Sequence, residues 1–410
     1  MDRLMPKRWV ILSLDALATS AINAYGSPWN ETPAMDQMAA MGMVYDRVIA
    51  TSEDSVELLA QLWGQRIGDQ SWVEQCRESG RIELFVNAGP QAIELAKHAE
   101  RFAFDQCTLI ESIPEVLQDA MPGDEIESTA MAKLLLPVLE RITDPSAPNW
   151  SILWAHSDSL IRCWDAPRWL FPIEEDEDEE PIDQLDWSLE DYGTQALPVD
   201  AEASVSEKPP AIFESLTVPF FAVSPDSHPD LITSWMQTYG CQIRLLDRLI
   251  TILMEAIEAA DGDIGLALIG TSGMSLGQNG WIGHRAGPIR SPQVHLPVIL
   301  FDNEGYGIRT PGLRSINDVM ISLIASPDQS SRVSPQQWAL DDALSEFAIE
   351  TCSSRAERVL TTHEWFFVRE GDHSRLFLKP DDRDDMNDIA DRCRDVVESM
   401  ETVPVISTKI

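Results

Sequence analysis

The chain has 410 residues, of which 44% are hydrophobic and 24% are charged, so it has the length and composition of a globular protein with a large core. Its 68 acidic residues outnumber its 30 basic residues and give a net charge of −38. This charge excludes nucleic acids and anionic membrane surfaces as partners, because both would be repelled. No apolar run approaches the roughly 20 residues that a membrane span requires.

The chain begins MDRLMPKRWVILSLDALATSA, which fits either a buried β-strand or a cleaved signal peptide. Asp15 interrupts the apolar stretch after Leu14, and this favours the strand and a cytoplasmic protein. The six cysteines lie far apart and include no CxxC pair, which predicts reduced thiols and no cysteine metal cluster. They are Cys76, Cys107, Cys163, Cys241, Cys352 and Cys393.

Short apolar runs that end in polar or small residues recur along the chain: WVILSLD, IELFVNAG, SILWAHSD, IGLALIGTSG and LPVILFD. Several are separated by stretches with helical periodicity, such as PAMDQMAAMG, SVELLAQLWG and RLLDRLITILMEAIEAA. This alternation predicts an α/β fold with a central, mostly parallel, mixed sheet sandwiched by helices. The carboxyl ends of parallel strands meet at one edge of a sheet, so we expect Asp15, His156 and Thr271 to lie close together.

The segment Glu174–Glu207 breaks this pattern, because it holds 14 acidic residues and no lysine or arginine. Mutual repulsion and scarce apolar residues predict an irregular, exposed insertion in the α/β domain. The alternative is an arm that docks onto a basic segment of a partner protein.

The C-terminal part has a different character. HEWFFVREGDHSRLFLKP predicts two strands around a Gly-Asp turn, and MNDIADRCRDVVESME predicts an amphipathic helix. We therefore expect a smaller C-terminal subdomain of antiparallel strands and a helix over residues 326–410, packed on the main sheet of an α/β domain over residues 1–325.

A glycine-rich loop, GTSGMSLGQNGWIGHR, follows the apolar run IGLALI. Loops in this position usually carry the chemistry of an α/β protein. Yet the stretch from Thr271 to Gly283 contains no carboxylate, histidine, cysteine or lysine. The loop therefore has the glycines of an active-site loop without its reactive groups.

The order of these elements resembles the sulfatase family of the alkaline phosphatase superfamily, and the likeness covers most of the chain. Family segments are matched by VILSLDALATSAINAYG, ETPAMDQMAAMGMVYDRVIA, SILWAHSDSLIRCWDAP, YGCQIRLLDRLITILMEAI, the loop with SLG and WIGH, and the tail from EWFFVREGDHSRLFLKP. In the long helix the matching residues are Tyr239, Ile243 and Asp247. The resemblance implies a sulfatase-like fold.

In this family a formylglycine, made from the cysteine of a Cys-x-Pro-x-Arg motif, attacks the sulfate ester. The resemblance places Asp54 at the cysteine, Val56 at the proline and Leu58 at the arginine. None of the three defining residues is present. The Asp54 carboxylate is then either a substitute nucleophile or the N-terminal cap of a helix.

The family also holds a divalent metal, commonly calcium, with carboxylates and an amide. Most positions that should serve this metal and the sulfate lack the family's residues; they carry Leu160, Ile161, Thr271, Ser272, Gln278 and Asn279. Only Asp15 stands where a metal ligand belongs, and one carboxylate cannot satisfy a calcium ion. Asp15 is alternatively a hydrogen-bonded carboxylate that caps the next helix.

Three further residues are candidates for a remaining site. His156 and His284 stand where the family often has histidine, and His156 alternatively serves as a satisfied core residue. His284 and Arg285 form the best remaining anion-binding pair, with Arg290 close in sequence. Trp154, Trp164, Trp169 and Trp281 are expected around the same cleft, either as a sugar-stacking platform or as filling.

The resemblance and the missing residues together predict a catalytically inactive sulfatase-like protein, a pseudoenzyme that binds or scaffolds and needs no cofactor. The alternative is a divergent hydrolase of sulfate or phosphate esters. It would use Asp54, or calcium or another divalent metal recruited at Asp15.

Overall fold

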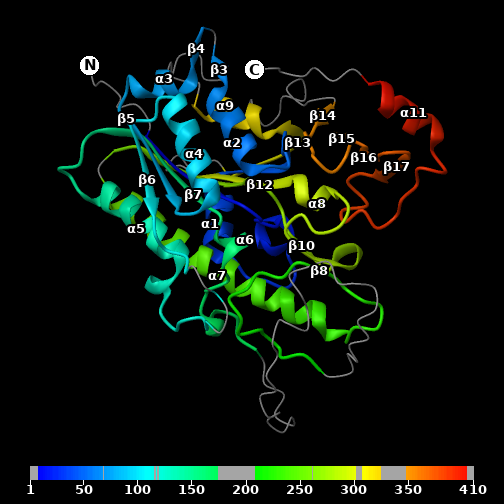
Figure 1. The fold of residues 1–410 in the computed structure, drawn as a ribbon. Coiled ribbons are helices and arrows are strands. Elements are labelled where there is room, and N and C mark those ends of the chain that lie inside the picture. The colour runs from blue at the N-terminus through cyan, green and yellow to red at the C-terminus, as the bar shows by residue number, and fades with distance from the viewer. Residues whose placement is uncertain are drawn as a thin grey trace.

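The computed structural model describes residues 8–67, 69–114, 117, 120–173, 208–260, 262–301, 307–324 and 348–403 (Figure 1). Its centre is an eight-stranded sheet with the order β13-β2-β12-β9-β1-β7-β5-β6. The strands are β1 (Arg8–Leu14), β2 (Met43–Ile49), β5 (Arg81–Asn87), β6 (Gln106–Ile110), β7 (Trp150–Ser157), β9 (Ile264–Gly270), β12 (His295–Phe301) and β13 (Ile308–Ser315).

All neighbouring strands of this sheet are parallel except where β12 pairs with β2 and β9. The apolar runs from the sequence form β1, β5, β7, β9 and β12. The predicted α/β architecture with a mostly parallel, mixed sheet is therefore confirmed.

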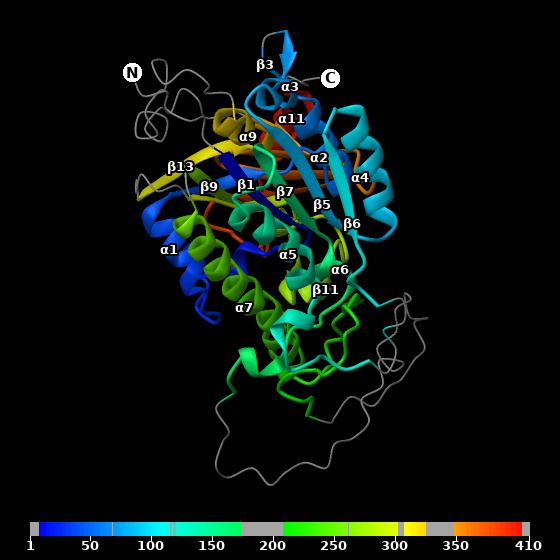
Figure 2. The same ribbon diagram turned by 90° about the vertical axis from the view of Figure 1, so that its left-hand side faces the viewer.

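Helices cover both faces of the sheet (Figure 2). The helices are α1 (Pro33–Met41), α2 (Ser55–Gly64), α3 (Trp72–Arg77), α4 (Pro90–Arg101), α5 (Ala130–Thr143), α6 (Ser159–Arg162), α7 (Asp230–Ala259), α8 (Ser291–Val294) and α9 (Ile316–Ile324). Helices α1, α5 and α7 bury their apolar residues in one core, and α2, α4 and α9 bury theirs in another. Val10 and Leu12 of β1 face the first core, whereas Trp9 and Ile11 face the second. Burial on both faces explains why β1 is apolar from Trp9 to Leu12.

A smaller antiparallel sheet follows, with the order β14-β15-β16-β17. Its strands are β14 (Ala348–Glu350), β15 (Arg358–Thr362), β16 (Trp365–Glu370) and β17 (His373–Leu378). Phe366 and Phe377 pack against the second core, and Phe367 faces α11 (Arg394–Thr402). The predicted hairpin is confirmed, but the helix begins at Arg394, later than the periodicity of MNDIADRCRDVVESME suggested.

Two predictions concern residues that the structure does not describe. The acidic segment Glu174–Glu207 and the expected boundary between residues 325 and 326 both lie outside the described residues. All six cysteines do lie within the described part, and each is a free thiol. Among the described helices, none is long and apolar enough to cross a membrane.

His295 at the start of β12 provides a test of how the sheet is packed. Its Nε2 atom lies 2.7 Å from the carbonyl oxygen of Asp46 on β2. The pKa of His295 is lowered to about 4, mainly by burial; the Asp46 carbonyl opposes this shift, and the cations Arg383, Arg47 and Lys379 add to it. The folded protein therefore favours the neutral ring.

We predict that His295 makes the free energy of unfolding fall as the pH drops. The contribution of a group with a lowered folded pKa is complete above its unfolded pKa of about 6.5 and is lost towards pH 4, up to about 3 kcal/mol. His295→Gln, which keeps a donor for the Asp46 carbonyl, should flatten this part of the profile. Urea unfolding of both proteins at several pH values measures the difference, and parallel profiles would contradict the assignment.

Candidate functional site

The carboxyl ends of β1, β7 and β9 bring the expected residues together. The register pairs Ser13 with His156, and the Asp15 N–H donates to the Ser157 carbonyl oxygen at 3.0 Å. On the other side, the Thr271 N–H donates to the Leu14 carbonyl oxygen at 2.8 Å. The prediction that Asp15, His156 and Thr271 gather at one sheet edge is therefore confirmed.

Asp15 is fully buried at this edge. Its Oδ1 accepts a hydrogen bond of 2.5 Å from the Thr271 hydroxyl, whereas Oδ2 has no hydrogen-bond partner. Burial alone would raise the pKa of Asp15, but His156, His284 and the hydroxyls of Ser55 and Thr271 together hold that pKa below its usual value. Asp15 therefore stays ionised. The Ser55 hydroxyl contributes by its proximity to Asp15 alone, because its Oγ has no hydrogen-bond partner.

Asp15 is a hydrogen-bonded carboxylate, as expected from the sequence, but it does not cap the next helix. The turn that follows β1, residues Thr19–Ala21, has no side-chain cap. The same segment is held instead by the long helix α7, because the Tyr239 hydroxyl donates to the Ala16 carbonyl oxygen at 2.6 Å and accepts from the Ala18 N–H at 3.0 Å. The Ser272 hydroxyl also accepts from the Ala16 N–H at 2.9 Å.

Two histidines, His156 and His284, interact electrostatically with this carboxylate. His156 is buried, and its Nδ1 lies 2.9 Å from the Ser13 hydroxyl, but its Nε2 has no partner. The burial of His156 agrees with its predicted place in the core, although only one of its ring nitrogens has a hydrogen-bond partner. Burial lowers the pKa of His156 and of His284, while the charge of Asp15 opposes the shift in both. The rings are therefore mostly neutral near pH 7.

Asp54 stands at the N-cap of α2, as the capping interpretation predicted. Its Oδ1 accepts the Glu57 N–H at 3.0 Å, and its Oδ2 lies 3.6 Å from Nη1 of Arg285. The Asp54 side chain is 52% exposed, so this ion pair is weak. Leu58, at the position of the family's arginine, is fully buried in the core and presents no charge.

The proposed anion-binding group is not assembled as the sequence suggested. Arg285 lies next to His284, and it has a φ of 53°, which is an uncommon backbone conformation for a residue with a side chain. Arg290 is directed away to the C-terminal subdomain, where its guanidinium covers the ring of Phe377 at 4.9 Å and donates to the Asp385 carbonyl oxygen. Arg290 is therefore close to the pair in sequence only, because its side chain is held at the aromatic surface of the C-terminal subdomain.

Arg355, which the sequence did not single out, fixes the loops around the site. Its Nε donates to Glu53 at 2.9 Å, and its Nη1 donates to the carbonyl oxygens of Arg285 and Gly287, both at 2.9 Å. Its Nη2 donates to the Gln293 side chain, also at 2.9 Å. An arginine in a charged tail carries no local pattern that would mark this role.

The same region is tied by backbone pairing. Ser52, just before Glu53, forms a parallel bridge with Cys352, and the Cys352 N–H donates to the Thr51 carbonyl oxygen at 2.9 Å. The loop at the position of the family's nucleophile is thus fixed to the start of the C-terminal subdomain.

The glycines of the loop have a steric reason. A Cβ atom at Gly273 would lie 1.9 Å from the Pro292 carbonyl oxygen. At Gly287, two residues beyond the loop and with a φ of 64°, a Cβ would lie 2.5 Å from the Trp281 ring. Close backbone approach therefore requires glycine, whether or not the loop carries catalytic groups.

The four tryptophans do not surround a common cleft. Trp154 and Trp164 are buried in the two different cores, on opposite faces of the sheet. Trp169 is 56% exposed, and its indole donates to the Asp124 carbonyl oxygen. Trp281 packs against Gly287. The expected cluster was wrong because strand alternation and helix position separate residues that lie close in sequence.

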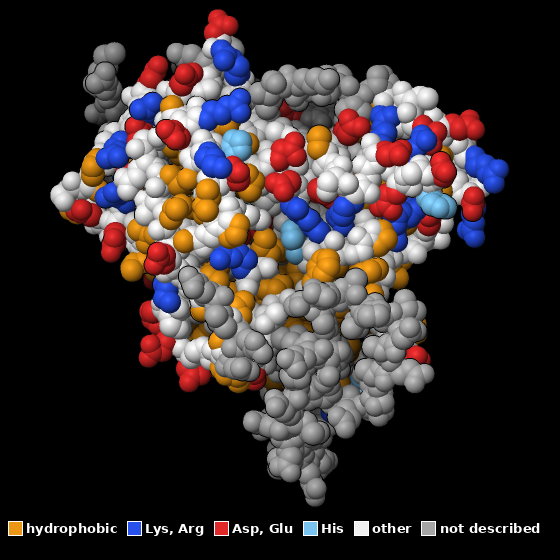
Figure 3. Space-filling model, viewed as in Figure 1, with side chains coloured by type: hydrophobic (Ala, Val, Ile, Leu, Met, Phe, Trp, Pro, Cys, Tyr) orange, Lys and Arg blue, Asp and Glu red, His pale blue; other side chains and the backbone are white. Residues whose placement is uncertain are grey.

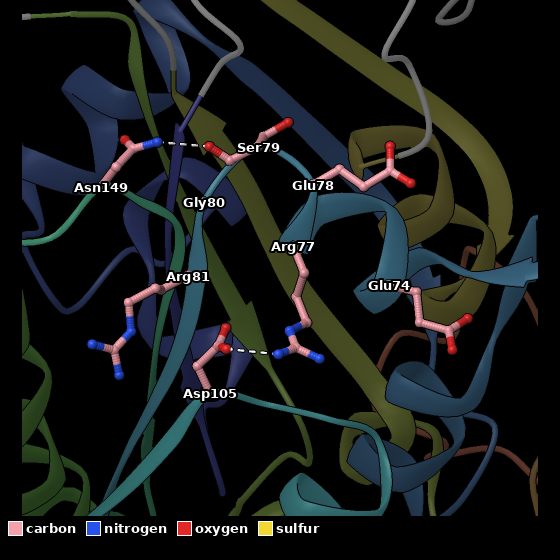
Figure 4. Close-up of a pocket in the computed structure, with 8 residues that line it drawn as sticks. All are labelled: Glu74, Arg77, Glu78, Ser79, Gly80, Arg81, Asp105 and Asn149. Atoms are coloured by element: carbon pink, nitrogen blue, oxygen red, sulfur yellow. Dashed lines mark hydrogen bonds and ion pairs between the residues drawn. The ribbon is translucent and has the colours of Figure 1, made fainter.

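A pocket of about 510 Å³ lies at the opposite end of the sheet (Figure 4). It is formed at the amino ends of β5, β6 and β7 and includes Arg77, Arg81 and Asp105. Arg77 is already paired with Asp105 at 2.8 Å, and the pocket is wide open to solvent. This pocket is therefore separate from the site at Asp15, which lies at the carboxyl ends of the strands.

A divalent metal fits the residues at Asp15 poorly. The structure has no group of three or more His, Cys, Asp or Glu side chains that could hold a metal ion, as far as its described residues extend. Asp15 offers one carboxylate, and one of its two oxygens already binds the Thr271 hydroxyl. Calcium takes six to eight oxygen ligands and zinc takes several nitrogen or sulfur ligands, so this donor set is too small for either.

Comparison with models of protein families gives no match, and comparison with curated proteins gives none either. Solved structures do match: a 2-O GAG sulfatase is 10% identical, with 97% of this chain and 90% of that chain covered and a TM-score of 0.62. The phosphonate monoester hydrolase of Agrobacterium radiobacter is 12% identical, with 96% and 94% covered and a TM-score of 0.60. A protein in the alkaline phosphatase superfamily from Vibrio parahaemolyticus is 11% identical, with 92% and 81% covered and a TM-score of 0.53.

This chain is thus similar to each of these proteins over nearly its whole length. At such low identity the likeness concerns the fold. The chain has the fold of the sulfatases and of the wider alkaline phosphatase superfamily, as the resemblance in its sequence implied.

We predict that Thr271→Val lowers the free energy of unfolding by about 2 kcal/mol, because the buried Asp15 carboxylate would lose its hydrogen-bond donor. Thr271→Ser keeps a hydroxyl and should stay within about 0.5–1 kcal/mol of the natural protein. Chemical denaturation near pH 7 compares the two variants. Equal stability of the valine and serine variants would show that this hydrogen bond contributes nothing.

We also predict that Arg355→Met destabilises the protein by about 3–5 kcal/mol, because it leaves Glu53 buried without a cation. The Arg355→Met, Glu53→Gln double variant should recover part of this loss, since no buried charge then remains unpaired. Denaturant titrations of the single and double variants complete the cycle. Strictly additive losses would contradict a direct interaction between the two side chains.

Proposed function

We propose that the protein is a catalytically inactive member of this fold that acts as a binding or scaffolding module. The observation that carries the proposal is the hydrogen bond of 2.5 Å between Thr271 and Asp15. At the position where the resemblance expects a metal-binding carboxylate, a neutral hydroxyl instead occupies an oxygen of the one remaining carboxylate. The Thr271 hydroxyl thus stabilises the buried charge of Asp15 by a hydrogen bond.

The position of the expected nucleophile supports the same proposal. Asp54 uses one oxygen to cap α2 and holds the other near Arg285. Val56 and Leu58 provide neither the proline nor the arginine that formylglycine formation requires. The loss of both a nucleophile and a metal commonly costs several kcal/mol of transition-state stabilisation for each group removed.

A divergent hydrolase is the alternative, and one observation favours it. The Asp54 carboxylate is half-exposed and lies near a guanidinium, which is an arrangement that can bind and attack an ester of an anion. The cap hydrogen bond opposes it, because a nucleophilic carboxylate would have to leave the N-terminus of α2. We therefore keep the inactive protein as the proposal.

We also propose a cytoplasmic location. The six free cysteines support a reducing compartment, since in an oxidising one such thiols commonly form disulfides. Two of them are inert where they lie, because burial raises the pKa of Cys241 to about 11 and that of Cys163 to about 12.

We predict that the purified protein hydrolyses neither aryl sulfates nor aryl phosphates above background from about pH 5 to about pH 9. Chromogenic esters, with calcium, magnesium, manganese or zinc added in turn, test this directly. Titration calorimetry with each metal should show no tight site.

Asp15→Ala and Asp54→Ala serve as matched controls for the same assays. Turnover that disappears in either variant would overturn the proposal and establish a hydrolase at this site. Turnover that both variants retain would instead identify a contaminating enzyme or a second site. Metal binding that is lost in Asp15→Ala but kept in Asp54→Ala would show that a metal is bound at Asp15.

A further inference from the structure

Strand β6 forms one open end of the eight-stranded sheet. It pairs only with β5, and Figures 1 and 2 show it at the margin of the sheet, near α4 and α5. The Ala88 N–H donates to the Ile110 carbonyl oxygen at 2.8 Å, which sets the phase of the pairing. Because alternate residues of a parallel strand turn their backbone groups to the same side, those of Thr108 and Ile110 face β5 and those of Cys107 and Leu109 face outward.

Within the part of the chain that the structure describes, this outer edge lacks the usual protection of an edge strand. Natural edges commonly carry charged side chains, proline or a covering loop, whereas β6 reads Gln-Cys-Thr-Leu-Ile without a charge. Leu109 is 45% exposed on the strand, and Ile93 of α4 and Leu136 of α5 are 57% and 56% exposed. Figure 3 shows hydrophobic side chains gathered on this face over α4 and β6.

A groove adjoins the open edge. It has a volume of about 440 Å³ and lies between β6 and the C-terminal half of α5. Thr108 and Phe85 line it from the sheet, and Pro137, Glu140 and Asp144 line it from the helix side. An added strand at the edge of β6 would therefore place alternate side chains into this groove and the others over the apolar surface beside α4.

The charges around the edge indicate which kind of segment would bind there. Glu111, Glu140 and Asp144 are exposed, and none of them forms a salt bridge in the part of the chain that the structure describes. The arginine of the groove, Arg141, is already paired with the buried Glu83 at 2.9 Å. A second copy would bring the same acidic groups and the same net charge of −38, so repulsion disfavours a symmetric pair of edges.

We propose that the edge of β6, with its adjoining groove, binds an extended basic segment of a partner protein as an additional strand. Outward backbone groups of Cys107 and Leu109 would supply the hydrogen bonds. Glu140 and Asp144 would attract lysine or arginine side chains of the segment, and Leu109 with Ile93 would contact its apolar residues. The proposal does not depend on whether the site at Asp15 is catalytic.

The probe is a fluorescein-labelled peptide of alternating lysine and valine, and fluorescence anisotropy measures its affinity for the full-length protein at low salt. Leu109→Pro removes an outward N–H that the sheet itself does not use, so it should weaken binding at least tenfold. Leu109→Ala keeps the N–H and should stay within about threefold. Combining Glu140→Gln with Asp144→Asn should weaken binding and reduce its salt dependence.

Hydrogen–deuterium exchange of the natural protein provides a measurement that needs no variant to fold. The peptide should slow exchange in the segment that contains Cys107 and Leu109. Equal binding by Leu109→Pro and Leu109→Ala, or unchanged exchange in β6, would overturn the proposal. So would equal affinity for the matching peptide of glutamate and valine, or sedimentation showing that the protein pairs with itself through this edge.

Discussion

The loops around the Asp15 carboxylate depend on the hydrogen bonds of the Arg355 guanidinium. It reaches from the start of the C-terminal subdomain to Glu53 and, in the same plane, to the carbonyl oxygens of Arg285 and Gly287. Because the five N–H donors of arginine are arranged in a rigid fork, one side chain can hold several loops at fixed separations. The small sheet thereby sets the position of α2 and of the glycine-rich loop together.

Under the proposal of an inactive protein, this arrangement holds the loops where a metal would otherwise do so. In a metal site, the cation itself draws the surrounding strand ends together, because several anionic ligands share its charge. Here Arg355 provides the positive charge from one side, and Thr271 holds the Asp15 carboxylate by a hydrogen bond. Tyr239 of α7 fixes the chain after β1 from the other side. Neutral and singly charged contacts therefore connect the strand ends and loops at this edge of the sheet.

The sequence predicted the parts of this structure that depend on local pattern. Continuous apolar runs indicated the buried strands, and the residues that end them indicated the sheet edge at Asp15. Asp54 was recognised as a possible cap because capping involves residues three apart. The positions of Arg290 and Arg355 could not be predicted, since each depends on partners in another part of the chain. Asp15 was misread as a cap for the same reason, because its partner Thr271 lies 256 residues away.

That separation has a consequence for the order in which the molecule can assemble. Strand β1 is synthesised well before one of its two neighbours, β9, which lies far behind it in the chain. At translation rates of about 5–20 residues per second, the 256 residues between Asp15 and Thr271 take on the order of 10 to 50 s to make. During this interval β1, which is apolar from Trp9 to Leu12, lacks the partner for one of its edges. Early shielding of β1, by β7 or by a chaperone, is thus a condition for efficient production of the protein.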